Sequence, residues 1–240
     1  MKVCVAQIKP TKGDIETNIT HHKKLIALAV SSGAEMIFFP ELSLTGYEPN
    51  LAKELATDIN DKRFDEFQLI SNANNITIGA GMPIKNKAGI YIGMIIFQPK
   101  QARQLYTKKY LHADEEPFFI AGTGGTALMN NKIALAICYE VFVPQHPEDA
   151  FKNGAVIYVA SVAKSAAGVK KANQILPANA LTYSMTVLMA NSTGFCDNFI
   201  SAGSSAIWTN NGKLAAQLDD TNEGILIIDT ITQEVTSAIL

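Results

Sequence analysis

The chain has 240 residues, of which 48% are hydrophobic and 18% are charged, and its formal net charge is -2. This balance argues against a partner with a strong charge of one sign, such as nucleic acid or a membrane surface. The three cysteines, Cys4, Cys138 and Cys196, are too few and too irregularly spaced for a disulfide framework.

The length fits one large domain, and no linker or shift in composition divides the chain. We therefore expect a single domain over residues 1–240. No stretch is apolar and long enough to span a bilayer, and residues 1–8 have the pattern of a strand rather than of a signal peptide. Cysteines without a framework suit a reducing compartment, so we expect a cytoplasmic protein.

The first half of the chain predicts alternating strands and helices. Apolar runs predict strands at residues 3–8, 36–39, 76–81, 90–97 and 101–106. Asp14 is a suitable N-cap for a helix that ends near Ser32, and a second helix is expected at 64–71.

The second half is richer in strands. Further apolar runs predict strands at residues 133–138, 155–161, 187–190, 205–208, 214–218 and 224–230. A helix is expected at 170–185, with Pro177 at its start or at a break, because proline lacks the N–H that a helix interior needs. Strand–helix units followed by late antiparallel strands indicate an α/β layered sandwich.

Cys138 is the most informative position, because it ends an apolar run and polar residues follow it. Open α/β sheets place their ligands at the carboxyl ends of strands. A free cysteine is most often a small buried hydrophobe, as we expect for Cys4 and Cys196. The position of Cys138 instead makes it a candidate nucleophile.

A cysteine nucleophile needs a base or a neighbouring cation, because the thiolate is the form that attacks. Glu41 directly follows an apolar run, so partial desolvation is expected to raise its pKa and make it a better base. His146, close to Cys138 in sequence, is an alternative base. His21 and His22 are expected on a solvated stretch of the first helix.

Lys108 follows another predicted strand and is a candidate for the group that stabilises an oxyanion, since a fixed ammonium in a dry site stabilises such charge strongly. Its neighbour Lys109 is expected to be solvated. A thiol, a carboxylate and an ammonium at strand ends are the components of an acyl-transfer site.

Three segments resemble the motifs of the nitrilase superfamily, the carbon-nitrogen hydrolases. They are Phe39-Pro-Glu-Leu-Ser-Leu-Thr-Gly-Tyr47, Tyr106-Thr-Lys-Lys-Tyr-Leu111 and Ile137-Cys-Tyr-Glu140. They occur in the family's order and at about its spacing, and the resemblance covers residues 1 to about 230. The second motif selects Lys108 rather than Lys109, because the family's lysine lies three residues before the leucine.

The resemblance implies an α/β fold, the four-layer α-β-β-α sandwich, which usually pairs with a second copy to form a homodimer or a higher homo-oligomer. It also implies that Glu41 is the general base and that Cys138 attacks an amide carbon to form a thioester. Lys108 and the backbone N–H of Tyr139 would stabilise the oxyanion. This mechanism needs no cofactor and no metal, and no spacing of His and Cys residues suggests a metal site.

The family often has a second glutamate after its lysine motif. The sequence offers Glu115 and Glu116, and the spacing from Lys108 favours Glu116 as the catalytic one. The candidate substrate-binding residues are Tyr47, Tyr139, Glu115, Ser161 and Ala163. The arginine that often follows the family's cysteine motif is missing here, and the loop at 161–164 differs, so the substrate is not inherited. Lys164 in this loop is a candidate partner for a substrate carboxylate.

The sequence therefore predicts a hydrolase that cleaves a non-peptide C–N bond of a small linear amide or carbamoyl compound. An acyltransferase that uses the same thioester, and a non-catalytic binding protein on this fold, are the alternatives. Pattern alone leaves open the acyl and amine groups of the substrate and the oligomeric state.

Overall fold

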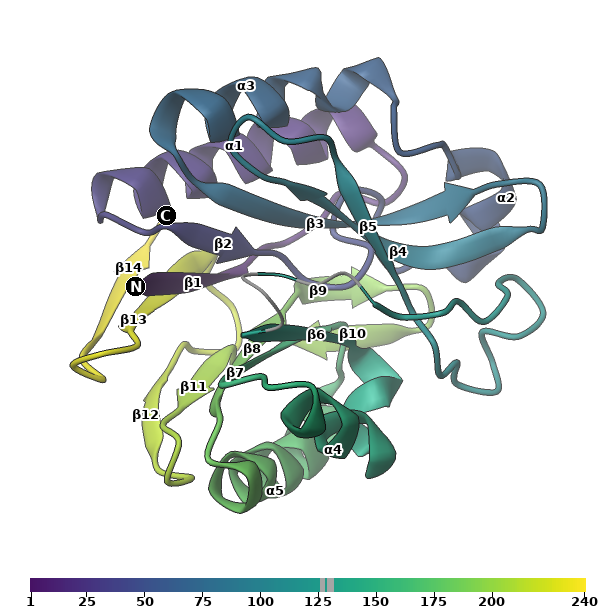
Figure 1. Cartoon of the computed structure of the whole chain (residues 1–240). Helices are drawn as coiled ribbons and strands as arrows, with labels where there is room; N and C mark the ends of the chain where they lie inside the picture. Colours follow the sequence, from purple (N-terminus) through teal and green to yellow (C-terminus); the bar gives the residue numbers. More distant parts are fainter. Residues whose placement is uncertain (126–127, 129–131) are drawn as a thin grey trace.

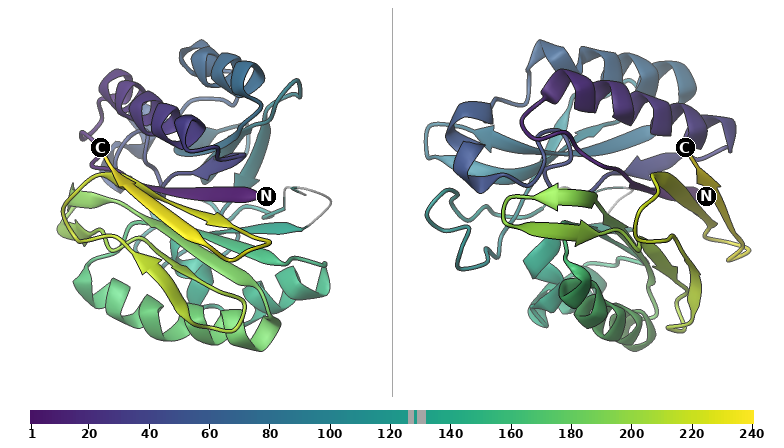
Figure 2. Two further views of the ribbon diagram at one scale, coloured as in Figure 1. Left: turned by 90° about the vertical axis from the view of Figure 1, so that its left-hand side faces the viewer. Right: turned by 180° about the vertical axis from the view of Figure 1, so that it is seen from behind.

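Two main β-sheets lie face to face, and helices cover the outer face of each (Figure 1). The computed structural model describes residues 1–125, 128 and 132–240. The side views show the purple and blue helices on one outer face and the green helix on the opposite one (Figure 2). This is the four-layer α-β-β-α sandwich that the sequence predicts.

The first sheet has seven strands in the order β14-β13-β1-β2-β3-β4-β5. Their bounds are β1 Lys2–Gln7, β2 Met36–Phe38, β3 Thr77–Lys85, β4 Ile90–Phe97, β5 Gln104–Thr107, β13 Gly224–Asp229 and β14 Val235–Ile239. The strands β1, β2 and β3 are parallel, and the remaining pairs are antiparallel. The carboxyl ends of β2 and β3 therefore lie at one edge, where the chain leaves β2 toward Glu41.

Helices α1 and α3 cover the outer face of this sheet (Figure 1). The helical segments of this half are α1 Ile15–Ser31, η1 Pro49–Leu51, α2 Ala52–Leu55, η2 Lys62–Phe64 and α3 Asp65–Asn74. The carboxylate of Asp14 accepts a hydrogen bond from the backbone N–H of Thr17 at 3.0 Å, which confirms the predicted N-cap of α1.

The second sheet has five strands in the order β12-β11-β8-β7-β6. Its strands are β6 Ile133–Ile137, β7 Ile157–Val162, β8 Thr186–Asn191, β11 Ala206–Trp208 and β12 Leu214–Gln217. The strands β6, β7 and β8 are parallel. The 3₁₀ turn η3 Cys138–Phe142 and helix α4 Gln145–Lys152 connect β6 to β7, and helix α5 Ala166–Tyr183 connects β7 to β8. A separate hairpin joins β9 Thr193–Cys196 to β10 Phe199–Ala202.

The core has three apolar layers, which follow from the two sheets and their helices. Ile26 and Phe97 belong to the layer between α1 and the first sheet. Leu226 and Leu135 belong to the layer between the two sheets. Trp208 belongs to the layer under α5. The middle layer joins both sheets, so the relative placement of their strand ends is fixed by packing.

The helix at 166–183 differs from its prediction, because Pro177 lies inside it instead of at a start or a break. Proline removes one helix hydrogen bond at a cost of about 3 kcal/mol. Leu176 and Ala180 on either side of it are fully buried. Burial of this apolar face offsets the lost bond, so the helix continues through the proline.

Candidate active site

Three loops bring the predicted catalytic side chains to the junction of the two sheets. Glu41 lies in the loop after β2, and Lys108 directly follows β5, both in the first sheet. Cys138 directly follows β6 in the second sheet. The first sheet brings Glu41 and Lys108 to one edge, and Cys138 meets them because the two sheets pack face to face.

The Glu41 loop is held tightly against β3. Leu42 has a positive φ of 49°, and the backbone of the loop lies so close to Gly81 that a Cβ there would be 2.4 Å from the Leu42 nitrogen and 2.5 Å from the Pro40 oxygen. Glycine at position 81 is thus required by the close approach of two backbones.

His22 supports the same loop from α1, contrary to the prediction that it is solvated. Its ring is buried, with Nδ1 2.7 Å from the carbonyl oxygen of Asn18 and Nε2 2.9 Å from Oγ of Ser43. Burial lowers the pKa of His22 to about 3, so the ring is neutral and packs against Phe39.

Cys138 has a positive φ of 45°, which is unfavourable for a residue with a Cβ and places the thiol at a sharp turn between β6 and η3. The buried carboxylate of Glu140 holds this turn by accepting the backbone N–H of Ile137 at 2.7 Å. Its other oxygen accepts the N–H of Lys109 at 2.6 Å. Glu140 therefore connects the turn at Cys138 to the segment that contains Lys108.

A buried charge cluster lies beneath the thiol. The ammonium of Lys108 donates to Oε1 of Glu41 at 2.7 Å and to Oε1 of Glu115 at 2.6 Å, and all three side chains are almost completely buried. Glu115 also accepts the hydroxyl of Tyr47 at 3.0 Å and the backbone N–H of His112 at 2.8 Å. These contacts fix the position of the ammonium.

Burial and the neighbouring charges shift the pKa values of this cluster. Burial raises the pKa of Glu41 to about 7; Lys108 opposes this shift and Glu115 adds to it. Burial alone would lower the pKa of Lys108, but Glu41, Cys138 and Glu115 raise it overall. Burial, and then Glu41, raise the pKa of Cys138 to about 11. The resting sulfur is therefore a thiol, and Glu41 titrates near neutral pH.

Oε2 of Glu41 is the available acceptor in the cluster. This oxygen is buried, and Lys108 donates to the other oxygen. Besides Lys108, the described side chain that hydrogen-bonds with this carboxyl group is the thiol of Cys138, and the carboxylate in turn raises the pKa of the thiol. A buried carboxylate next to a thiol is suited to accept its proton.

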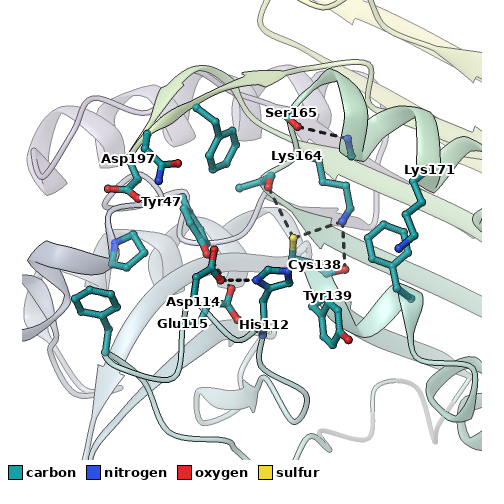
Figure 3. Close-up of a pocket in the computed structure, with 17 residues that line it drawn as sticks. Tyr47, His112, Asp114, Glu115, Cys138, Tyr139, Lys164, Ser165, Lys171 and Asp197 are labelled. Atoms are coloured by element: carbon teal, nitrogen blue, oxygen red, sulfur yellow. Dashed lines mark hydrogen bonds and ion pairs between the residues drawn. The ribbon is translucent and has the colours of Figure 1, made fainter.

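The thiol opens into a cavity of about 470 Å³ (Figure 3). Its lining includes Tyr47, Glu115, Cys138, Tyr139, Ala163 and Lys164. The volume lies within the range of sites for small molecules. Of the predicted substrate-binding residues, Tyr47, Tyr139, Glu115 and Ala163 thus face the cavity.

Two predicted site residues lie elsewhere. Glu116 is exposed, whereas Glu115, the alternative weighed from the sequence, contacts Lys108. The turn at 112–119 directs only one of the adjacent carboxylates inward, so Glu115 and not Glu116 lies against Lys108. Ser161 is fully buried and donates from Oγ to the carbonyl oxygen of Phe39 at 2.8 Å, so it joins the two sheets and does not line the cavity.

His146 does not serve as the alternative base in this arrangement. Its Nε2 is 3.0 Å from the hydroxyl of Tyr106, and its Nδ1 is 2.8 Å from the hydroxyl of Tyr158. Both ring nitrogens are engaged away from the thiol. Sequence reasoning missed the β9–β10 hairpin, where Asp197 in the turn and Phe199 at the start of β10 line the cavity. The only sequence signal for it is the Asp-Asn pair between two short apolar stretches.

Among the described residues, no helix combines the length and the apolar character needed to cross a membrane. In the same part of the chain, no group of three or more His, Cys, Asp or Glu side chains is arranged to hold a metal ion.

The family model described as "Carbon-nitrogen hydrolase" matches residues 2–239. The chain is 24% identical to a glutamine-dependent NAD(+) synthetase of Thermotoga maritima over 95% of its own length, but it spans only 42% of that protein. It is 27% identical to a Staphylococcus aureus protein named "Hydrolase in agr operon", over 98% of this chain and 93% of that one.

Among solved structures, a variant of the amidase from Nesterenkonia sp. AN1 superimposes with a TM-score of 0.86 at 20% identity, over 95% of this chain and 90% of that chain. That structure shows covalent addition of the acetamide moiety of fluoroacetamide at the active-site cysteine. At this identity, the similarity confirms the fold.

Proposed function

This chain belongs to the carbon-nitrogen hydrolase family, and from that premise we propose that it cleaves a non-peptide C–N bond of a small linear amide or carbamoyl compound. The observation that carries the proposal is the position of Cys138 next to the buried Glu41–Lys108 pair and in the lining of a cavity. The products would be a carboxylic acid and ammonia or an amine.

In the proposed first step, Oε2 of Glu41 accepts the thiol proton while the sulfur of Cys138 forms a bond to the carbonyl carbon. Negative charge develops on the carbonyl oxygen. Lys108 and the backbone N–H of Tyr139 would stabilise it, since the first amides of a helical turn have no partner within the turn.

In the second step, protonated Glu41 donates its proton to the departing nitrogen, the C–N bond breaks, and a thioester to Cys138 remains. Water then attacks the thioester with Glu41 again as the base. The C–S bond breaks, the acid leaves, and the thiol is restored. Glu115 would act by holding the Lys108 ammonium in place, as its hydrogen bonds to Lys108 and Tyr47 suggest.

Ammonia release from a panel of small amides and carbamoyl compounds, with the wild-type chain beside Cys138→Ala, tests this proposal. We expect release by the wild type alone, and we expect intact-mass spectrometry of the wild type to detect an acyl adduct on Cys138. Cys196→Ala is the matched control, because Cys196 is a buried free thiol outside the cavity lining. Equal ammonia release by wild type and Cys138→Ala would contradict the proposal.

Glutamine is a second candidate substrate. The chain matches glutamine-dependent NAD(+) synthetases of Thermotoga maritima and Aquifex aeolicus over 95% of its length, but it covers 42% of each. We propose that, if glutamine is the substrate, the ammonia serves a separate partner chain. Including glutamine in the panel, with and without a candidate synthetase, distinguishes this use from simple hydrolysis.

We further propose that residues 1–240 act as one domain in the cytoplasm and that the chain forms a homodimer or a higher homo-oligomer. The resemblance to the family supports the assembly, and three free thiols suit a reducing compartment. Sedimentation equilibrium of the purified chain measures the oligomeric state directly.

A further inference from the structure

Lys164 is a second lysine at the nucleophile, and it comes from the loop after β7. Its Nζ lies 3.5 Å from the sulfur of Cys138 and 3.5 Å from the carbonyl oxygen of the same residue (Figure 3). Asn191 fixes the backbone on both sides, since it accepts the N–H of Lys164 at 2.9 Å and donates to its carbonyl at 3.2 Å. The ammonium is therefore held where the reaction begins.

This ammonium is buried without a carboxylate partner. Lys164 is 4% exposed, and among the described residues no carboxylate oxygen lies within 4.0 Å of its Nζ. Besides the carbonyl oxygen and sulfur of Cys138, its neighbour is the ring of Phe142, whose centroid is 4.1 Å away. A buried ammonium without an anion is costly, so this arrangement favours the appearance of negative charge close to it.

The charges of the site balance only when Lys164 is included. Glu41 and Glu115 contribute two buried carboxylates, and Lys108 supplies one buried ammonium between them. Lys164 supplies the second. Without it, the site would carry a net negative charge both before and after the thiolate of Cys138 forms.

We propose that Lys164 is a catalytic residue whose ammonium stabilises the thiolate of Cys138 during attack. The inference rests on the proposed role of Cys138 as the nucleophile. The proton moves from sulfur to Oε2 of Glu41, so the neutral thiol and the carboxylate become a thiolate and a carboxylic acid. No charge enters or leaves the site, and Lys164 keeps its protons throughout.

The pKa of the Cys138 thiol depends on charged groups from several segments of the chain. Those that act on its pKa are Glu41 after β2, Lys108 after β5, Glu115 in the following loop, and Lys164 after β7. Burial and the two carboxylates raise this pKa, whereas Lys164 and Lys108 lower it. The cavity wall around the thiol also carries the ionisable side chains of Tyr47, His112, Asp114, Tyr139, Lys171 and Asp197.

The test is the rate at which Cys138 is alkylated by iodoacetamide, a neutral reagent, as a function of pH. Lys164→Met removes the charge and keeps an apolar stem. We expect the rate profile of the variant to move to higher pH by about one unit, so that alkylation at about pH 8 is about tenfold slower. Peptide mass spectrometry assigns the adduct to Cys138, and Cys138→Ala gives the background.

Lys171→Met is the matched control. Lys171 is exposed, and its Nζ lies 4.3 Å from the centroid of the same Phe142 ring, so this variant removes a charge from the same part of the cavity. We expect its iodoacetamide profile to match the wild type. Lys164→Arg keeps a cation and should restore most of the rate. Lys164→Gln is a second neutral variant in case the Met variant does not fold.

An unchanged iodoacetamide profile in the neutral Lys164 variants would overturn the inference. If the neutral Lys164 variants react more slowly with the anionic reagent iodoacetate but not with iodoacetamide, Lys164 instead binds an anionic group of the substrate. Alkylation requires no turnover, so the readout does not depend on the substrate. Failure of wild-type Cys138 to react at any pH would contradict its role as the nucleophile, a result distinct from an unchanged profile.

Discussion

Glu41 is the residue whose protonation state is expected to set the pH dependence of the reaction. Burial raises the pKa of this carboxyl to about 7, despite the opposing effect of Lys108. A general base works in its deprotonated form, so activity should be present above this pKa and lost as the pH falls through it. We expect kcat/KM to fall by about tenfold per unit below about pH 6.

The variant that tests the role of Glu41 as the base is Glu41→Gln, which keeps the shape of the side chain and removes its basic carboxylate. We expect kcat/KM to fall by about 10²–10⁴-fold. Glu116→Gln is a suitable control, because Glu116 is an exposed carboxylate and should leave the profile unchanged. Steady-state kinetics over the pH range provide the measurement, and a flat wild-type profile across neutral pH would refute the assignment of Glu41 as the base.

Residue types and spacing predicted which side chains meet, but not how adjacent residues turn. The motifs predicted Glu41, Lys108 and Cys138, and the structure brings all three to one place. Spacing favoured Glu116 over Glu115, but Glu115 contacts Lys108, because the direction of each carboxylate depends on the turn that follows Lys108. The hydrogen bond from the N–H of His112 to Glu115 belongs to that turn and has no signature in the sequence.

At the scale of elements, most strands were predictable from their apolar residues, whereas the hairpin β9–β10 and the last strand β14 were not. The strands β1, β6, β7 and β8 are buried and were predicted from their apolar residues. Helix α4 was missed; it contains one proline, and a second proline stands at its N-cap. Pro144 is the N-cap and Pro147 is in the first turn, where a missing N–H costs little.

Strand β3 positions the Glu41 loop through Gly81, and this contact can be tested. A Cβ at position 81 would collide with backbone atoms of Pro40 and Leu42, which cannot move independently of Glu41. We expect Gly81→Ala to lower stability by about 1–3 kcal/mol and to reduce kcat by displacing the base. Chemical denaturation and steady-state kinetics measure the two effects.

Gly93→Ala in β4 is the matched control for this contact. A Cβ there would approach side-chain atoms of Ile84 and Leu105 at 3.0 Å, and side chains yield more easily than backbone. It should therefore retain a kcat near that of the wild type. If Gly81→Ala were as active as Gly93→Ala, the close packing of β3 against the loop would not be what positions Glu41.

At the scale of the whole molecule, the site depends on how the two sheets are packed. Glu41 and Lys108 belong to the first sheet, and Cys138 belongs to the second. Ser161 shows why the sequence could not place every residue, since its hydroxyl bridges the sheets to Phe39 instead of facing the cavity. The packing of two sheets is set by many side chains together, and no single motif records it.

The shared middle layer predicts that both halves of the sandwich unfold together. Ile26 lies in the layer under α1, and Trp208, the only tryptophan, lies in the opposite layer under α5. Ile26→Ala removes fully buried methyl groups and should lower the free energy of unfolding by about 2–5 kcal/mol. Because the layers are joined through the layer between the sheets, the fluorescence of distant Trp208 should report the whole loss.

The measurement is denaturation by guanidinium at one protein concentration, followed by Trp208 fluorescence and by far-UV circular dichroism. We expect both midpoints to shift equally in Ile26→Ala, as coincident transitions require of one cooperative unit. Ile231→Ala is the control, since Ile231 is 82% exposed and its truncation should leave both midpoints in place. If the Trp208 midpoint stayed at the wild-type value while the dichroism midpoint shifted, the two halves would unfold separately. The first sheet, with Glu41 and Lys108, could then unfold while the turn that contains Cys138 remains folded.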